Sequence, residues 1–365
     1  YLPAFEQGIA EAKAEIDAIV ANTEEPTFEN TIEAMEYAGE TLNRVANVFY
    51  NLMEANTNDE MQQIAEQISP MLNEYSMYVS LNADLFAKVK SVYEKKDELG
   101  LEKDQLKLLE DNYKSFVRGG ANLSDEDKEL YSKWSEELSL ASLQFSKNVL
   151  AATNAYTLHI TDSADLAGLP EFVKTMAAET ASEKGLEGWA FTLDAPSYSP
   201  FLKYSEVRNL RKDMWTAYNT RAIGGEFDNT DVVKKIVDLR IRIANILGYE
   251  TYADYALEER MAKDKATVNG FIKDLLEPSM EFAKKDVADV YAFAKKNGFE
   301  DSQLMPWDFS YWSEKYQQAE YSLSAEELKP YFQLESCIDA VFGLATRLYG
   351  ISFTELDNVP VYHED

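Results

Sequence analysis

Apolar residues recur along much of this chain with the period of an α-helix. One stretch shows spacings of four, three and seven residues, which place its apolar side chains on one helix face. These residues are Phe28, Ile32, Met35, Leu42, Val45, Phe49 and Leu52. Pro26 and Thr27 stand directly before the stretch, as is typical of a helix start. The pattern predicts one helix here, with a face that packs against a core.

A second helical pattern carries its own start signal. Residues 124–127 (SDED) resemble a capping box, and an apolar face follows them. That face consists of Leu130, Trp134, Leu138, Ala141 and Phe145. Residues 324–327 repeat the start signal before Leu328. Glycine and proline are sparse in these segments and no repeat period is evident, so the sequence predicts a non-repetitive assembly of long helices rather than a solenoid.

One region breaks the helical period. Apolar and polar residues alternate around 156–161 and again around 189–194, which is the period of a half-buried strand. Between them, Gly168-Leu-Pro170 leads into a helix that we expect to end at Gly185, and residues 196–200 read as a rigid turn. The predicted fold class is therefore mainly α, with one small β-sheet insertion.

The length suggests about two domains or one elongated domain. We place an organisational boundary near Asn154. It separates an N-terminal helical region, 1–153, from a helical region with the small sheet, 154–365. This division does not require that the two regions fold independently.

Charge narrows the choice of partners. The chain has 65 acidic residues against 35 Lys and Arg, which gives a net charge of -30. Such a chain repels phosphate backbones and anionic headgroups, so we expect neither nucleic acid nor a membrane surface as a partner. No run of about 18 apolar residues is present to span a bilayer. A solvated acidic surface is the simplest meaning of the charge.

The one cysteine, Cys337, excludes an intrachain disulfide. Its neighbours Ile338, Val341, Phe342 and Ala345 recur at helical spacing. We therefore expect a packed thiol rather than a nucleophile or a metal ligand.

The chemical motifs are mostly missing. The sequence has no GxxxxGK[ST] phosphate loop, no GxGxxG fingerprint after a strand, no GxSxG elbow and no CxxC pair. A zinc peptidase needs two His one helical turn apart, a third ligand and a carboxylate base. The two histidines, His159 and His363, are far apart in the sequence. We read His159 as a strand residue on the polar face, and His363-Glu364 as a chance match to the start of HExxH.

Two groups of charged residues remain as candidates. We read Glu258, Glu259 and Asp228 as solvated or capping carboxylates. Arg208 and Arg211 share a helix face, so they could bind a substrate carboxylate or pair with acids of the chain itself. Structural ion pairing is favoured, because this chain has acids to spare.

Several segments resemble the thimet oligopeptidase and neurolysin family of zinc metallopeptidases, in family order across nearly the whole chain. They are TFENTI (27–32), SFVRGG (115–120), FSKNV (145–149), TLDAPSY (192–198), NLR (209–211) with AY (217–218) and TR (220–221), ILGY (246–249), and PWD (306–308) with PYF (330–332). The stretch from Phe28 through LNRV (42–45) to ANT (55–57) is most similar to the bacterial peptidyl-dipeptidase (dipeptidyl carboxypeptidase) branch.

The resemblance implies an elongated, almost wholly helical molecule with a channel between two lobes that admits short, unstructured peptides. It implies a neurolysin-like N-terminal part, in which 154–365 forms part of the channel wall. In the family, the HExxH helix, the third zinc ligand and the Tyr and Arg groups that bind substrate follow the segment similar to 359–363. We therefore assign no catalytic, cofactor-binding or metal residue in this chain.

Two hypotheses follow. In the first, the chain is the N-terminal, non-catalytic portion of a zinc-dependent peptidyl-dipeptidase or oligopeptidase that hydrolyses short peptides and releases C-terminal dipeptides. Zinc would then bind only the intact parent enzyme, the missing C-terminal catalytic part would be a partner, and this portion alone would be inactive. In the second, the chain is a stand-alone helical peptide-binding or interaction module without enzymatic activity.

The ends of the sequence favour the first hypothesis, since it opens on Tyr1 rather than Met and stops soon after an apolar segment at 359–361. A cut fragment should expose apolar surface that the missing part would cover. We expect a cytoplasmic location, and a periplasmic one stays open because the native N-terminus is missing.

Overall fold

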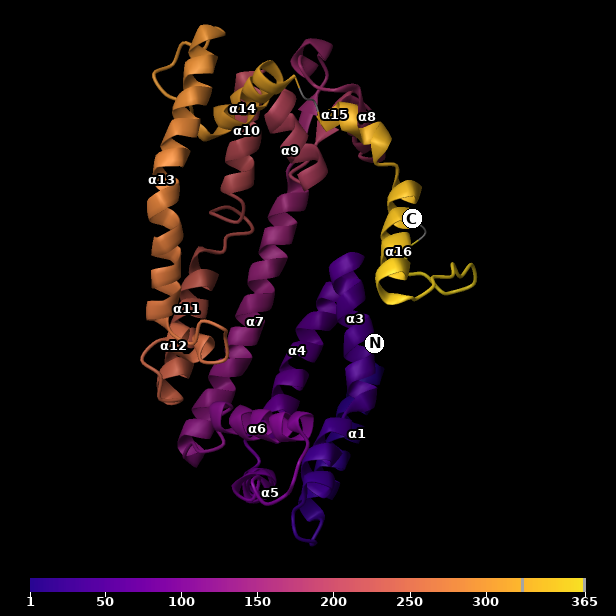
Figure 1. Ribbon diagram of the computed structural model, residues 1–365, viewed down its shortest axis with the longest axis vertical. Helices are drawn as coiled ribbons and strands as arrows, with labels where there is room; N and C mark the ends of the chain where they lie inside the picture. The colour runs from indigo at the N-terminus through magenta and orange to yellow at the C-terminus, as the bar shows by residue number, and fades with distance from the viewer. Residues whose placement is uncertain (323–324, 364–365) are drawn as a thin grey trace. The chain divides into compact units, whose positions relative to one another are not determined.

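The computed structural model describes residues 1–322 and 325–363, most of which are helical (Figure 1). The mainly α fold class is confirmed. Contacts between residues divide the chain into two compact units. The first comprises Tyr1–Val149 and Ala222–Gly270, and the second comprises Leu150–Arg221 and the described residues from Phe271 onward. The predicted division into 1–153 and 154–365 stays a prediction.

The first unit is built from helices. They are α1 (Leu2–Ala21), the π-helix η1 (Phe28–Glu33), α2 (Ala34–Tyr37), α3 (Glu40–Ala55), α4 (Asp59–Ser80), α5 (Ala83–Glu94), α6 (Lys103–Arg118), most of α7 (Asp125–Ala155), α11 (Thr230–Ile246), α12 (Tyr252–Leu257) and the start of α13 (Lys265–Lys296).

The expectation of a single helix from Phe28 to Leu52 is wrong, because the stretch is divided among η1, α2 and α3. It begins as predicted, because Thr27 Oγ1 accepts a hydrogen bond from the backbone N–H of Asn30. The chain then leaves the helix at Ala38 and turns at Gly39, whose φ of 79° is the left-handed conformation that favours glycine. The Gly39 N–H donates to Glu15 Oε2 at 2.7 Å, so the turn is anchored to α1.

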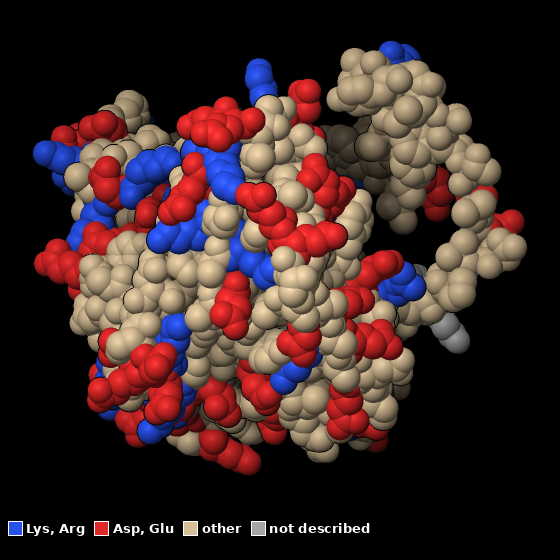
Figure 2. Space-filling model, turned by 90° about the horizontal axis from the view of Figure 1, so that it is seen from below, with Lys and Arg blue, Asp and Glu red and all other residues tan. Residues whose placement is uncertain are grey.

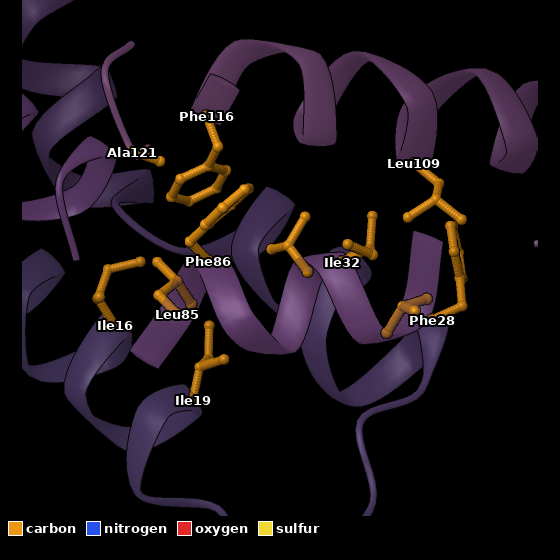
Figure 3. Packing of buried hydrophobic residues seen from close by; sticks show 11 residues of the cluster. Ile16, Ile19, Phe28, Ile32, Leu85, Phe86, Leu109, Phe116 and Ala121 are labelled. Carbon is orange, nitrogen blue, oxygen red and sulfur yellow. The ribbon is translucent and has the colours of Figure 1, made fainter. Parts of the chain in front are cut away.

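This break sends the apolar stripe into two cores. Phe28 and Ile32 pack in a cluster with side chains of α1, α5 and α6, which Figure 3 shows from close by. Within that cluster the rings of Phe86 and Phe116 stack with centroids 5.8 Å apart. Leu42 and Phe49 belong instead to the core between α1, α3 and α4. A uniform period therefore concealed a change of packing partner.

The start signal of α7 is confirmed. Ser124 Oγ accepts from the Asp127 N–H at 3.2 Å and donates to Asp127 Oδ2 at 2.8 Å. Along the apolar face that follows, Ala141 is buried, but Leu130 and Phe145 are more than a third exposed. The similar signal at 324–327 begins with a residue that lies outside the described ranges.

The second unit contains the small sheet and the remaining helices. They are β1 (Leu158–Ile160), the 3-10 helix η2 (Ser163–Leu166), α8 (Glu171–Glu183), β2 (Trp189–Phe191), α9 (Ala195–Tyr204), α10 (Arg208–Asn219), the rest of α13, α14 (Pro306–Tyr321), α15 (Ala325–Leu328), the 3-10 helix η3 (Lys329–Tyr331) and α16 (Leu334–Tyr349).

The predicted sheet is confirmed as an antiparallel pair. Leu158 lies opposite Phe191 and Ile160 opposite Trp189. Gly188 precedes β2 with a φ of 93°, and a Cβ there would lie 2.4 Å from the Ile160 carbonyl oxygen. Only glycine fits this approach of the two backbones. Helix α8 ends before Gly185, as expected.

Residues 196–200 form part of α9, so the expected rigid turn is wrong. Pro196 occupies the first turn of the helix, where a backbone N–H has no partner within the helix. Pro200 lies inside α9 and removes one donor there. The sequence signal for a turn was therefore a signal for a helix start.

Helix α16 forms where the apolar pattern around Cys337 predicts it, but the thiol is only partly buried. Ile338, Val341 and Phe342 are 42%, 63% and 42% exposed. The expected packed thiol is therefore found only in part, because the apolar helix face around it is largely exposed. Among the described helices, none combines the length and apolar character that crossing a membrane requires.

Candidate functional site

Arg208 and Arg211 converge on one buried carboxylate. Arg208 donates from Nε to Asp308 Oδ1 at 2.8 Å and from Nη2 to Oδ2 at 2.7 Å, a bidentate geometry. Arg211 Nη2 donates to Asp308 Oδ1 at 3.1 Å. Asp308 is fully buried and Arg211 is 2% exposed. This arginine–aspartate cluster joins α10 to α14 within the second unit.

Local sequence places the three groups. Arg208 begins α10, and Arg211 follows one turn later on the same face. Asp308 lies in the first turn of α14, where its Oδ2 also accepts from the Met305 N–H at 3.2 Å. The PWD motif thus supplies a helix cap that doubles as the partner of two arginines.

Backbone carbonyls and an aromatic ring complete the environment of Arg211. Its Nε donates to the Trp307 carbonyl at 3.0 Å, and its Nη1 donates to the Ser205 carbonyl at 2.8 Å. The guanidinium also lies 4.2 Å from the centroid of the Tyr311 ring. Arg208 further pairs with Asp301 at 2.5 Å.

The electrostatics follow from burial and pairing. Burial alone would raise the pKa of Asp308, but the hydrogen bonds from Arg208, Met305 and Arg211 hold it below its usual range. Burial lowers the pKa of Arg211, and Asp308 opposes that shift. The hydrogen bond to Asp308 raises the pKa of Arg208. The favoured sequence interpretation, structural ion pairing, is confirmed, since internal acceptors occupy both guanidinium groups.

A second charged cluster lies in the first unit, between α6 and α12. Arg118 pairs with Glu258 and donates to the Tyr255 carbonyl at 2.8 Å. Glu258 also accepts a hydrogen bond from the Tyr249 hydroxyl. This hydrogen bond is the main reason why the pKa of Glu258 is lowered. Burial, and to a lesser extent the hydrogen bond to Glu258, raises the pKa of Tyr249 to about 12. Glu258 is 40% exposed, so it is partly solvated as expected, and it is also paired with Arg118.

The other two candidate carboxylates, Glu259 and Asp228, have different kinds of partner. Glu259 pairs with Lys114 of α6. Asp228 is a capping group as predicted, because its Oδ1 accepts from the Gly224 N–H at 2.9 Å and the Thr230 N–H at 3.0 Å. Its hydrogen bond with the Thr230 hydroxyl contributes most to a lowered pKa. Distant partners, which sequence spacing cannot identify, decide between the two roles.

The described residues do not fit a zinc site. His159 lies on β1 with Nε2 2.6 Å from the Glu187 carbonyl oxygen, and His363 is exposed after α16. Within 1–322 and 325–363, no three His, Cys, Asp or Glu side chains gather closely enough to hold a metal ion. No catalytic step can therefore be derived through a metal held by these residues.

Charged side chains on the surface are mixed in sign. On the face drawn in Figure 2, acidic groups are spread widely and lie among basic groups. Elsewhere among the described residues, exposed ion pairs one helical turn apart include Arg44 with Glu40 and Lys285 with Asp289. Such pairs contribute little to stability and keep the surface hydrated.

Comparison with known proteins adds what the geometry lacks. Residues 201–365 match Peptidase family M3. Over 370 aligned residues the whole chain is 35% identical to a dipeptidyl carboxypeptidase of Escherichia coli (strain K12), of which it covers 54%. It is 33% identical to an oligopeptidase A of Salmonella typhimurium, again over all of this chain and 54% of the relative.

A probable cytosolic oligopeptidase A of Arabidopsis thaliana is 33% identical over 93% of this chain and 50% of its own length. The chain thus spans about half the length of the curated relatives it matches. The resemblance to this group of peptidases is confirmed.

Proposed function

Because this chain is related over its whole length to dipeptidyl carboxypeptidase and oligopeptidase A, we propose that it is the substrate-positioning portion of a zinc-dependent peptidase. The intact protein would hydrolyse short peptides and release C-terminal dipeptides. The observation that carries the proposal is the similarity along the full chain at 35% identity. A cytoplasmic location is part of the proposal, supported by the cytosolic relative.

The proposed division of labour has a physical basis. Zinc, when bound in such an enzyme, lowers the pKa of a bound water and polarises the scissile carbonyl. The peptide must also be held in register with that centre, and positioning of this kind can supply a large part of the rate. The described residues hold no metal-ligand group, so we assign positioning to this chain and the metal to a further part of the protein.

Exposed apolar side chains on two helices are consistent with a further part of the same protein that packs against this chain. On α13 the exposed side chains are Phe271, Ile272, Leu275, Leu276, Met280, Phe282 and Val287. On α16 they are Leu334, Ile338, Val341, Phe342, Leu344 and Leu348. Large exposed apolar patches mark interaction sites on soluble proteins. We propose that the catalytic part of the same protein packs on them.

The intact protein provides the test. We expect it to cleave short peptides two residues from their C-terminus, with activity lost on chelation and restored by zinc. Mass spectrometry of the products measures both the reaction and its register. Single amino acids as products, or cleavage that chelators leave unchanged, would contradict the proposed activity.

A stand-alone peptide-binding module is the second candidate. One observation favours it: among the described residues, no group of His, Cys, Asp or Glu side chains could hold a metal ion. Sequencing the transcript of the natural gene discriminates the two. A reading frame that continues into an HExxH helix supports the peptidase, and a stop codon after Asp365 supports the binding module.

A further inference from the structure

Helix α14 separates two hollows in the second unit. One, of about 340 Å³, lies against α9, with Tyr198 and Lys203 on one side and Ser310 and Glu314 on the other. The second, of about 390 Å³, lies against α13. Phe309, Ser313 and Gln317 of α14 line both hollows, so the two lie on either side of one row of side chains on that helix. We call this surface the α14 groove.

The lining of the α14 groove suits a peptide. Tyr198, Phe309 and Tyr316 give the lining aromatic surface, while Ser313 and Gln317 add hydrogen-bond donors and acceptors for a peptide backbone. Binding sites commonly combine apolar and aromatic walls with a few polar groups. The hydroxyl and amide groups require no fixed sequence in the peptide backbone that they contact.

Glu314 gives one end of the groove a charge preference. Its side chain is only 4% exposed, and its carboxylate accepts from Gln318 Nε2 at 3.0 Å. Lys203 Nζ lies 2.8 Å from the other oxygen, on a side chain that is 43% exposed. The Glu314 carboxylate is therefore buried and held by two partners, whereas the Lys203 side chain is partly in contact with solvent.

Such an ion pair can exchange its cation. If an ammonium or guanidinium of a ligand takes the place of Lys203, the buried carboxylate keeps a counterion and Lys203 returns to water. The groove also carries Asp286 and Asp289 against Lys285, so acids exceed bases among its lining residues. A chain with a net charge of -30 attracts cationic ligands in addition.

We propose that the α14 groove binds a short peptide through a basic side chain, which displaces Lys203 beside Glu314. The identity of the ligand as a peptide rests on the proposed function, while the preference for a positive charge rests on Glu314. The groove would thus set which peptides are held along this part of the chain.

Fluorescence anisotropy on the full chain tests the proposal. Two labelled short peptides are compared that differ at one central residue, lysine in the first and norleucine, which lacks the ammonium, in the second. We expect the lysine peptide to bind about tenfold more tightly, and rising salt to reduce this difference. Equal affinities, or full competition by a free polyamine at the same concentration as the peptide, would overturn the proposal.

Three variants locate the binding. Glu314→Gln keeps the shape and removes the charge, so it should abolish the preference for lysine and leave norleucine binding unchanged. Lys203→Ala removes the internal competitor and should strengthen lysine binding. Glu179→Gln, at an exposed position of α8 outside the groove, is the matched control and should change neither affinity. A Lys203→Ala variant that binds the lysine peptide more weakly would contradict the exchange.

The outcomes separate this proposal from the proposed function. If the intact protein cleaves peptides while Glu314→Gln binds them as the wild type does, the groove proposal alone fails. If the chain binds basic peptides in the groove while the intact protein cleaves none, the proposed peptidase fails and the groove stands. Circular dichroism of each variant shows that a lost preference is not lost folding.

Discussion

Asp308 is the residue on which most of the second unit's buried charge depends. Two arginines and one backbone N–H donate to a carboxylate with no exposed surface. Removing one partner of such a buried pair leaves the other charges desolvated, which costs far more than the pair itself contributes. The cluster is thus a sensitive point for stability rather than a source of chemistry.

Asp308→Asn should destabilise the second unit by about 3 kcal/mol or more, because the buried Arg211 loses its counterion and Arg208 keeps only the exposed Asp301. Trp215 and Trp307 report on this region, since their rings lie 5.6 Å apart beside the cluster. Urea unfolding followed by tryptophan fluorescence measures the change. Asp301→Asn is the control, because that carboxylate is 53% exposed and its loss should cost less than about 1 kcal/mol. Equal effects of the two substitutions would refute the role given to Asp308.

The same carboxyl predicts a pH dependence. Since pairing lowers the pKa of Asp308 in the folded state, its ionised form contributes stability above the unfolded pKa of about 3.9. That contribution is lost as the pH falls through the lower folded value. The difference in unfolding free energy between wild type and Asp308→Asn should therefore be full at neutral pH and shrink in strong acid. A difference that is constant down to the acid limit would show that folding does not lower the pKa of this carboxyl.

At this scale the sequence predicts roles better than partners. The abundance of acids indicates that Arg208 and Arg211 are paired, yet Asp308 lies 97 positions beyond Arg211 and no spacing rule identifies it. Spacing likewise does not identify Arg118 as the partner of Glu258, because the two residues are 140 positions apart. Local roles are different, since the sequence alone allows the prediction that Asp228 caps the helix that begins two residues later.

At the scale of elements, glycines decide where a periodic pattern stops. The apolar period from Phe28 to Leu52 is unbroken, and the helix still ends at Tyr37, two residues before Gly39 takes a left-handed conformation. The residue was visible in the sequence, but an isolated glycine inside a helical pattern is also tolerated at modest cost. Its contact with Glu15 of α1 belongs to tertiary structure. The sheet pairing of β1 and β2, in contrast, follows a period of two that has few competitors.

Two Gly→Ala substitutions of opposite sign test this reading. Gly39→Ala should destabilise the first unit by about 1 to 2 kcal/mol, because an L-residue is strained at φ 79°. Gly270→Ala, within helix α13 and with open space where the new Cβ would lie, should stabilise by about 1 kcal/mol. Thermal unfolding followed by circular dichroism gives both values. Stabilisation by Gly39→Ala would mean that a continuous helix is preferred across this position.

At the scale of the whole chain, composition and period predict the helical class, but the grouping of helices depends on long-range contacts. Residues of 222–270 join the first unit because Asn229 bonds to the Phe145 carbonyl and to Asn148, and because Arg118 bonds to α12. None of these pairs leaves a signal in local sequence. A contiguous division such as 1–153 and 154–365 is the natural first guess from sequence, whereas the contact-defined units are discontinuous.

The exposed faces of α13 and α16 predict association of the isolated chain. Sedimentation velocity at increasing concentration should show a rising sedimentation coefficient, since uncovered apolar surface favours contact between copies. Leu276→Lys should reduce association. Glu277→Gln makes the same change of charge on the polar face of α13 and should not reduce it. A wild type that stays strictly monomeric at high concentration would contradict the proposal that another part of the protein packs on α13 and α16.

The central claim is that this chain positions peptides and that the metal lies in a further part of the protein. Elemental mass spectrometry of zinc in this chain tests it most directly, combined with an assay of short-peptide cleavage in the presence and absence of a chelator. We predict no stoichiometric zinc and no cleavage by this chain alone. About one zinc per chain together with chelator-sensitive cleavage would contradict the claim and require a metal site that the described residues do not form.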